Sequence, residues 1–179
     1  FIGPSCASMG NAKPKNKELI NFTQQSIERN GADIVTTNRY DWASGTWDKN
    51  IVFLEKQGLL VNFVGGKGNM GGEKSMKLTD YDHVYLIIVI GNRNQAKSLN
   101  VGMTDGDGSE AVWSLSLAGQ PVGMPLVCKM SLAKPDRFDK PGKVQGLDKA
   151  KIKKWTISGD WQDPKVEVLL VKLGAATSS

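Results

Sequence analysis

The feature that most limits the fold of this chain is a period-two alternation of apolar and polar residues in short segments. The alternation is cleanest at residues 111–117, where Trp113, Leu115 and Leu117 fall on one face, and it recurs at residues 126–132. Short segments of this kind are typical of β-strands with one buried face. Further strands are expected at residues 33–40, 51–54, 59–64, 74–78, 83–90, 98–104, 155–157 and 166–173.

Stretches rich in Gly, Asn and Asp separate these segments, at residues 65–72, 91–94, 105–108 and 119–121. About nine or ten short strands divided by such turns predict an all-β sandwich or barrel in one domain. The pattern is less clear in two places. Residues 18–30 fit either a short helix or a strand followed by a turn. One helical turn is expected at 147–152, where Asp148 could cap it.

The 179 residues divide into three predicted parts: an N-terminal arm at 1–17, the β-sandwich domain at 18–173 and a C-terminal tail at 174–179. The arm holds few large apolar groups, and ordering each residue costs about 1–2 kcal/mol, so the arm can be ordered only against another surface. That surface is either its own β-domain or a neighbouring copy, which would make the chain a homo-oligomer. No apolar run approaches the roughly 20 residues of a membrane-spanning helix.

The net charge of +5 raises the question of nucleic-acid binding. The lysines are dispersed, however, and the two small clusters at 13–17 and 149–154 have acidic residues among or near them. This pattern favours a solvated basic surface, so we expect no nucleic-acid partner.

Two glycine-containing stretches resemble ligand-binding motifs. Residues 66–71 match a dinucleotide-binding GxGxxG, but an extended segment follows where a helix should hold the pyrophosphate, so we expect a flexible loop. Asp105 and Asp107 place carboxylates at alternate positions, like the opening of a calcium loop. The later positions of an EF-hand hold Glu110 and Ser116, which favours a tight hairpin turn. Asp105 and Asp107 remain candidate ligands of a structural calcium ion, and we expect no other cofactor.

No catalytic constellation stands out, so we expect no enzymatic activity. His83 is the only histidine, no GxSxG nucleophile elbow is present, and no two carboxylates are marked out as a glycosidase pair. With one histidine and no CxxC, a Cys/His zinc site is also not expected. Cys128 alternates with core aliphatics, and the spacing leaves open whether it forms a disulfide with Cys6.

The tryptophans fall into two groups. Trp113 and Trp155 alternate with aliphatic residues and are expected in the core. The other three lie in polar stretches, where an exposed ring can stack on the C–H face of a sugar while neighbouring polar groups bind its hydroxyls. The candidate carbohydrate-binding residues in these stretches are Arg39, Tyr40, Trp42, Trp47 and Trp161. The alternative, that these tryptophans cap the ends of a sandwich, is equally open.

Three stretches resemble a known family: residues 80–94, 99–113 and 146–155, together with the closing VEVLLVKL. The first is an Asp-Tyr pair leading into the long apolar strand and an Asn-containing turn. The second contains Asp-x-Asp-Gly, and the third reads Gly-Leu-Asp-x-x-x-Ile-x-x-Trp. These features are similar to those of galactose-binding-like jelly-roll modules attached to polysaccharide hydrolases, in particular the carbohydrate-binding-like N-terminal domain of agarases.

The resemblance implies a jelly-roll β-sandwich over roughly residues 33–173, carbohydrate binding, and an extracellular or cell-surface location. Such modules often hold a structural calcium ion. Because the sugar-binding residues of the family vary from loop to loop, the resemblance transfers none of them. The leading hypothesis is a non-catalytic exported module that binds a polysaccharide or glycan. The rival is a structural subunit of a surface or filamentous assembly, whose N-terminal arm contacts a neighbour.

Overall fold

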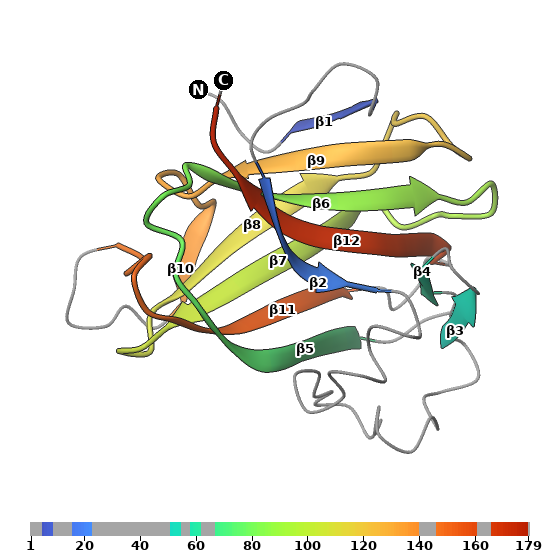
Figure 1. Ribbon diagram of the computed structural model, residues 1–179. Helices are drawn as coiled ribbons and strands as arrows, with labels where there is room; N and C mark the ends of the chain where they lie inside the picture. The colour runs from blue at the N-terminus through green and yellow to red at the C-terminus, as the bar shows by residue number, and fades with distance from the viewer. Residues whose placement is uncertain are drawn as a thin grey trace.

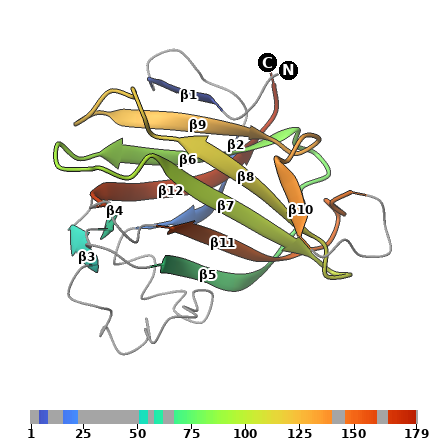
Figure 2. The same ribbon diagram turned by 180° about the vertical axis from the view of Figure 1, so that it is seen from behind.

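The structure is a computed structural model of the chain, and it describes residues 5–8, 16–22, 51–54, 58–61, 67–139, 146–160 and 166–178. Within these ranges the regular elements are twelve β-strands. No helix among the described residues is long and apolar enough to cross a membrane. The strands form two antiparallel sheets that pack face to face, and Figures 1 and 2 show them from opposite sides.

The first sheet, sheet A, has seven strands in the order β1-β9-β6-β12-β4-β3, and β2 also pairs with β12. Both central strands, β6 and β12, are apolar over most of their length, as expected of strands that are covered on two faces. The strands of sheet A are β1 Ser5–Ser8, β2 Asn16–Asn21, β3 Ile51–Leu54, β4 Gly58–Val61, β6 His83–Ile90, β9 Pro125–Ser131 and β12 Val168–Ala176.

The second sheet, sheet B, has five strands in the order β10-β8-β7-β11-β5. Its strands are β5 Lys67–Met76, β7 Ser98–Asp105, β8 Glu110–Ser116, β10 Arg137–Asp139 and β11 Ile152–Asp160. The alternation in β8 is reflected directly in burial, because Trp113 and Leu115 are buried while Ser114 and Ser116 are exposed. The all-β prediction and most of the predicted strands are therefore confirmed.

The core lies between the inner faces of the two sheets. Trp113 and Trp155 are both 0% exposed, which confirms their predicted place. Phe22, just after β2, meets Trp155 edge to face with ring centroids 5.6 Å apart, an arrangement that aromatic pairs prefer. The indole Nε1 of Trp113 donates a hydrogen bond to the Ser131 carbonyl oxygen at 2.8 Å, which ties sheet B to β9 of sheet A.

The prediction of a flexible loop at the GxGxxG stretch is wrong, because β5 begins at Lys67 and runs through it. Gly71 pairs with Thr156 of β11. A Cβ atom at Gly71 would overlap the backbone carbonyl oxygen of Trp155, so glycine allows a close approach of two strands here. Glycine in this stretch therefore serves strand packing rather than a turn.

The structure also resolves two other local expectations. Of the ambiguous residues 18–30, residues 18–21 belong to strand β2, which pairs with β12, and residues 23–30 lie outside the described residues. The helical turn expected at 147–152 is a β-turn closed by the Lys151 amide donating to the Asp148 carbonyl oxygen. Asp148 does cap it, since its Oδ1 accepts a hydrogen bond from the Ala150 amide. Finally, β1 and β10 are too short for a sequence pattern to reveal.

The N-terminal arm contains strand β1, which pairs with β9 at the edge of sheet A. Cys6 lies directly opposite Cys128 in this pairing, and the two form a disulfide. The strands β2 and β12 run across the boundaries drawn at residues 17 and 173, and the division into arm, domain and tail remains a prediction.

Candidate functional site

The outer face of sheet B brings small and polar side chains together in rows that cross the strands. The central row is formed by Arg137, Val112, Gly102, Thr156 and Gly71, which are successive backbone partners from β10 to β5. Apart from Arg137, the residues of this row have short side chains or none. The Thr156 hydroxyl lies over Gly102, where a Cβ atom would overlap it.

Polar residues line both sides of this central row. On one side the partners are Asp139, Glu110, Thr104, Lys154 and Glu73. On the other side Ser114, Asn100 and Ser158 are partners across β8, β7 and β11. We call this surface the polar face and define it as Asn100, Thr104, Glu110, Ser114, Arg137, Asp139, Lys154, Thr156 and Ser158.

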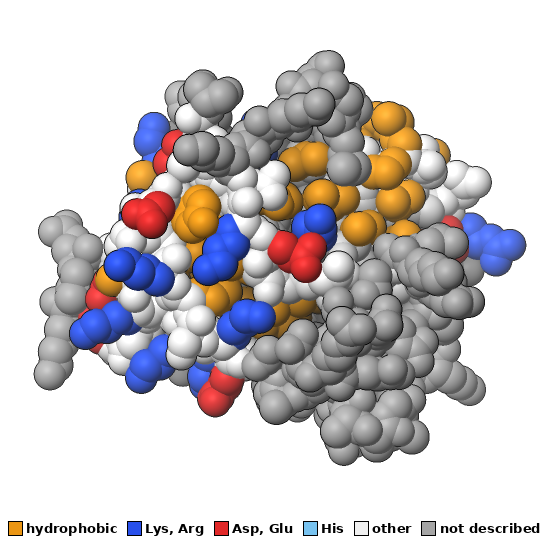
Figure 3. Space-filling view, viewed as in Figure 1, with side chains coloured by type: hydrophobic (Ala, Val, Ile, Leu, Met, Phe, Trp, Pro, Cys, Tyr) orange, Lys and Arg blue, Asp and Glu red, His pale blue; other side chains and the backbone are white. Residues whose placement is uncertain are grey.

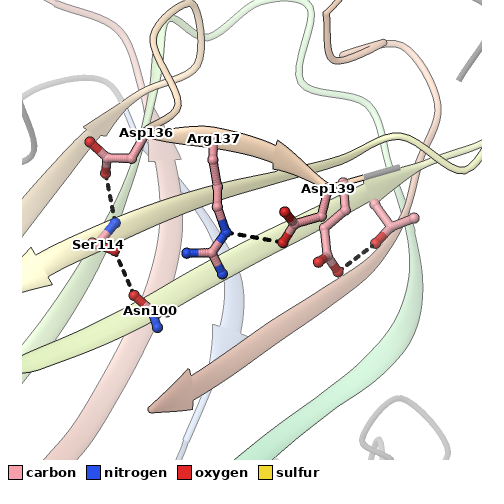
Figure 4. A network of polar contacts seen from close by, with 7 residues as sticks. Asn100, Ser114, Asp136, Arg137 and Asp139 are labelled. Atoms are coloured by element: carbon pink, nitrogen blue, oxygen red, sulfur yellow. Dashed lines mark hydrogen bonds and ion pairs between the residues drawn. The ribbon is translucent and has the colours of Figure 1, made fainter. Parts of the chain in front are cut away.

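Hydrogen bonds orient the side chains at the Asn100 end of the polar face (Figure 4). The Ser114 hydroxyl donates to Oδ1 of Asn100 at 2.7 Å, and the Ser114 amide donates to Oδ2 of Asp136 at 2.7 Å. The first bond fixes which side of the Asn100 amide faces β8. Side-chain amides held in this way can offer both a donor and an acceptor to the hydroxyl groups of a ligand.

The Arg137 end of the polar face is oriented in the same way. Nε of Arg137 donates to Oδ2 of Asp139 at 3.1 Å, and Figure 4 shows the guanidinium extending from β10 over the neighbouring strands of sheet B. Thr104 donates its hydroxyl hydrogen to Oε2 of Glu110 at 3.2 Å. Planar guanidinium and carboxylate groups can bind adjacent hydroxyls in pairs, so this end of the face also suits a ligand rich in hydroxyl groups.

The five predicted carbohydrate-binding residues, Arg39, Tyr40, Trp42, Trp47 and Trp161, lie outside the described residues. Sequence reasoning missed the polar face, because its residues come from four strands and become neighbours only through pairing. It also missed Phe138, an exposed aromatic residue on β10 beside Arg137. A strand of three residues carries too little periodicity to be recognised, and no signal in the sequence points to Phe138.

The predicted calcium ligands lie in the turn between β7 and β8, where Asp105 is 2% exposed. Its Oδ1 accepts hydrogen bonds from the Asp107 and Ser109 amides, and its Oδ2 accepts one from the Asp148 amide. These three N–H groups direct their positive ends at the carboxylate, where a cation would have to bind. No group of three or more His, Cys, Asp or Glu among the described residues could hold a metal ion. As placed, Asp105 and Asp107 form a hydrogen-bonded turn, and a calcium ion held by them remains a prediction.

Asp105 connects two of the three stretches that resemble the carbohydrate-binding modules, residues 99–113 and 146–155. It belongs to the Asp-x-Asp-Gly stretch, and its bond to the Asp148 amide, 2.9 Å long, reaches the Gly-Leu-Asp stretch before β11. Both motifs therefore have a role in the fold.

His83 lies beside Asp82 at the start of β6, with 2.6 Å between Nδ1 and Asp82 Oδ1. These two residues resemble the acid and base of a catalytic triad. The other ring nitrogen, Nε2, is buried and has no hydrogen-bond partner among the described atoms. In a catalytic triad a nucleophile lies at that nitrogen, and none of the described residues places one there.

No protein-family model matches the sequence, and no curated protein matches it by sequence. Solved structures match it through the fold. A family 11 carbohydrate-binding module from Clostridium thermocellum, in complex with a β-1,3-1,4-mixed-linked tetrasaccharide, has a TM-score of 0.52 at 10% identity. That match covers 99% of this chain and 98% of the module. A second structure of a family 11 module, determined in solution, has a TM-score of 0.52 at 12% identity, covering 99% and 97% of the two chains.

An agarase also matches, with a TM-score of 0.50 at 10% identity, over 82% of this chain and 25% of the agarase chain. At such identities the likeness establishes the fold. The chain has the jelly-roll β-sandwich of carbohydrate-binding modules, as the resemblance in its sequence predicted.

Proposed function

We propose that this chain is a non-catalytic carbohydrate-binding module that acts outside the cytoplasm and holds a polysaccharide on the polar face. The observation that carries the proposal is the polar face itself, where hydrogen-bonded side chains of β7, β8 and β10 flank a row of small residues. Such a surface offers many oriented donors and acceptors, and a polysaccharide offers a matching density of hydroxyls. The match to a module solved with a tetrasaccharide supports the same ligand class.

The disulfide between Cys6 and Cys128 supports the proposed location, because disulfides persist in oxidising compartments. The predicted residues Arg39, Tyr40, Trp42, Trp47 and Trp161 remain a second possible location for the sugar, where stacking rather than hydrogen bonding would dominate.

Binding to soluble mixed-linked β-1,3-1,4-glucan and to agarose, measured by affinity gel electrophoresis and calorimetry, tests the proposal. The double variant Asn100→Ala/Arg137→Ala should bind at least about tenfold more weakly, since two hydrogen bonds of about 1 kcal/mol each are lost. Lys129→Ala is the matched control, because Lys129 is exposed on the opposite sheet, and its affinity should not change. The double variant must keep the wild-type circular dichroism spectrum.

Trp42→Ala and Trp47→Ala separate the two locations. If these variants lose binding while Asn100→Ala/Arg137→Ala keeps it, the sugar binds at the tryptophans and the polar face is not the site. A wild-type protein that binds neither polysaccharide, and no member of a broad glycan array, would contradict carbohydrate binding altogether.

A further inference from the structure

The polar face differs in the sign of its charge from the chain as a whole. The chain has a formal net charge of +5. On and beside the polar face, the described charged side chains are the carboxylates Glu73, Glu110, Asp136 and Asp139 and the cations Arg137 and Lys154. With four negative and two positive groups, the formal net charge that a ligand meets here is −2.

Both cations of this surface are already paired with carboxylates. Nε of Arg137 lies 3.1 Å from Oδ2 of Asp139. Nζ of Lys154 lies 3.7 Å from Oε1 of Glu73. Because the two opposite charges of a pair largely cancel beyond the pair itself, Arg137 and Lys154 present little excess positive charge to an anionic ligand.

Glu110 and Asp136 form no ion pair within the described part of the chain. Oε2 of Glu110 accepts a hydrogen bond from the Thr104 hydroxyl at 3.2 Å, and Oδ2 of Asp136 accepts one from the Ser114 amide at 2.7 Å. These neutral donors orient the two carboxylates and leave their negative charges in place. Because Thr104 and Ser114 lie on opposite sides of the central row, a ligand that lies along this row has a negative charge on each side.

The lysines at the nearby end of sheet B lie beyond these rows of side chains. Lys151 and Lys153 lie against Gly106, in the turn that joins β7 to β8. The same turn contains the carboxylates Asp105 and Asp107. The charges at this end of the sheet therefore balance each other, and they do not offset the negative charge of the polar face.

We propose that Glu110 and Asp136 determine the charge specificity of the polar face. They allow uncharged polysaccharides to bind and weaken the binding of polysaccharides that carry carboxylate or sulfate groups. A neutral sugar can donate hydroxyl hydrogens to both carboxylates, whereas an anionic group is repelled by them. Two like charges about 4 Å apart in water change a binding constant by about fivefold. This inference rests on the proposed function, because it assigns a ligand class to the same site.

A neutral oligosaccharide and its acidic derivative test the inference. Tetrasaccharides from mixed-linked β-1,3-1,4-glucan and from agarose are titrated into the full chain in a calorimeter, before and after their primary hydroxyls are oxidised to carboxylates. In about 0.1 M NaCl, the wild-type protein should bind the oxidised form at least about tenfold more weakly than the neutral form. In about 1 M NaCl, where the Debye length is only about 3 Å, this difference should fall to about threefold or less.

The double variant Glu110→Gln/Asp136→Asn removes both charges and keeps an acceptor oxygen on each side chain. It should bind the oxidised form about tenfold more tightly than the wild type does, and its affinity for the neutral form should stay within about threefold. Glu18→Gln/Asp80→Asn is the control with the same change in net charge. Glu18 lies on β2 of sheet A and Asp80 lies in the turn before β6, so this variant should discriminate as the wild type does. Both variants must keep the wild-type circular dichroism spectrum.

The possible outcomes separate this inference from the proposed function. Equal wild-type affinity for the neutral and oxidised forms overturns the inference and leaves carbohydrate binding in place. The same conclusion follows if discrimination persists unchanged in about 1 M NaCl, because its cause is then not charge. A double variant that discriminates as strongly as the wild type overturns the role of Glu110 and Asp136. A wild-type protein that binds no neutral sugar contradicts both the inference and the proposed function.

Discussion

The outer faces of the two sheets differ in chemistry although both cover the same core. On sheet A the outward residues of β6, β9 and β12 form an apolar cluster of Tyr85, Ile87, Val127, Val171 and Ala176, which we call the apolar face. Figure 3 shows hydrophobic side chains gathered on this side of the molecule. On sheet B the outward-facing residues form the polar face and the central row that it flanks. Val112 is the one branched aliphatic residue in that row.

Burial separates the two faces as clearly as composition does. Tyr85 is 6% exposed because its ring lies over Gly174, its partner on β12, where a Cβ atom would overlap the ring. Burial raises the pKa of Tyr85, and the negative charge of Glu18 on β2 raises it further. On the polar face, by contrast, Ser114 and Lys154 are exposed. The Tyr85 ring therefore lies on an outer face, but it is buried against its own sheet and is not exposed for stacking on a ligand.

The largest expected effect concerns the core that both faces share and sets the scale for the others. Trp113→Ala or Trp155→Ala should lower the free energy of unfolding by about 3–5 kcal/mol, because each removes a fully buried aromatic side chain. Chemical unfolding followed by far-ultraviolet circular dichroism measures this loss. A cost below about 1 kcal/mol for either variant would contradict the placement of that tryptophan in the core.

A glycine on each face allows a matched comparison. Gly174→Ala forces the buried Tyr85 ring to move and should cost about 1–3 kcal/mol of unfolding free energy, as overpacking does. Gly102→Ala meets the Thr156 hydroxyl, which can turn away on a half-exposed side chain, so its cost should stay below about 1 kcal/mol. Gly174→Ala combined with Tyr85→Ala is the control, because without the ring the added methyl group should cost little. Equal losses of unfolding free energy for Gly174→Ala and Gly102→Ala would contradict the expectation that the polar face accommodates an added methyl group more easily than the apolar face.

An ion pair between neighbouring strands on the outer side of each sheet allows a further comparison. Lys172 and Glu18 of sheet A are 3.3 Å apart, with side chains 34% and 48% exposed. Lys154 and Glu73 of sheet B are 3.7 Å apart, with side chains 54% and 74% exposed. Exposed pairs contribute about 0–1 kcal/mol, so Glu18→Gln should be slightly destabilising and Glu73→Gln nearly neutral. Double-mutant cycles with Lys172→Met and Lys154→Met measure both couplings, and a larger coupling for Glu73 would reverse the expected order.

The smallest effect is a dependence on acid at the end of sheet A. A hydrogen bond from the Ser178 amide, followed by one from His83, lowers the pKa of Asp82 from 3.8 to about 2. A lowered pKa means that the contact stabilises the protein above about pH 4 and is lost as the pH falls from about 4 towards 2. The protection factor of the Ser178 amide, which is its intrinsic hydrogen-exchange rate divided by its measured rate, should therefore fall over that range. Because Asp82 is half exposed, global stability should change little. Asp82→Asn should abolish the pH dependence, and an unchanged profile in that variant would assign the effect to another group.

Local pattern was enough to predict the strand content, the buried faces and the two core tryptophans of this protein. The reason is physical: whether a side chain can be buried depends on the period of its own strand, and the clean alternation around Trp113 shows it directly. The jelly-roll resemblance added the architecture. Where the pattern was weak, as at β10 with its three residues, or where glycine serves close packing, as at Gly71, the sequence did not indicate the strand.

The tertiary structure alone decided which residues meet. Asn100, Ser114 and Arg137 share the polar face because β7, β8 and β10 are neighbours in one register. Cys6 and Cys128 are separated by 122 residues along the chain, and their disulfide depends on the pairing of β1 with β9. Strand order and register arise from the packing of the whole sandwich, since a shift of one residue would turn every side chain of a strand to the other face. No stretch of sequence contains that information by itself, because it belongs to pairs of segments that fold against each other.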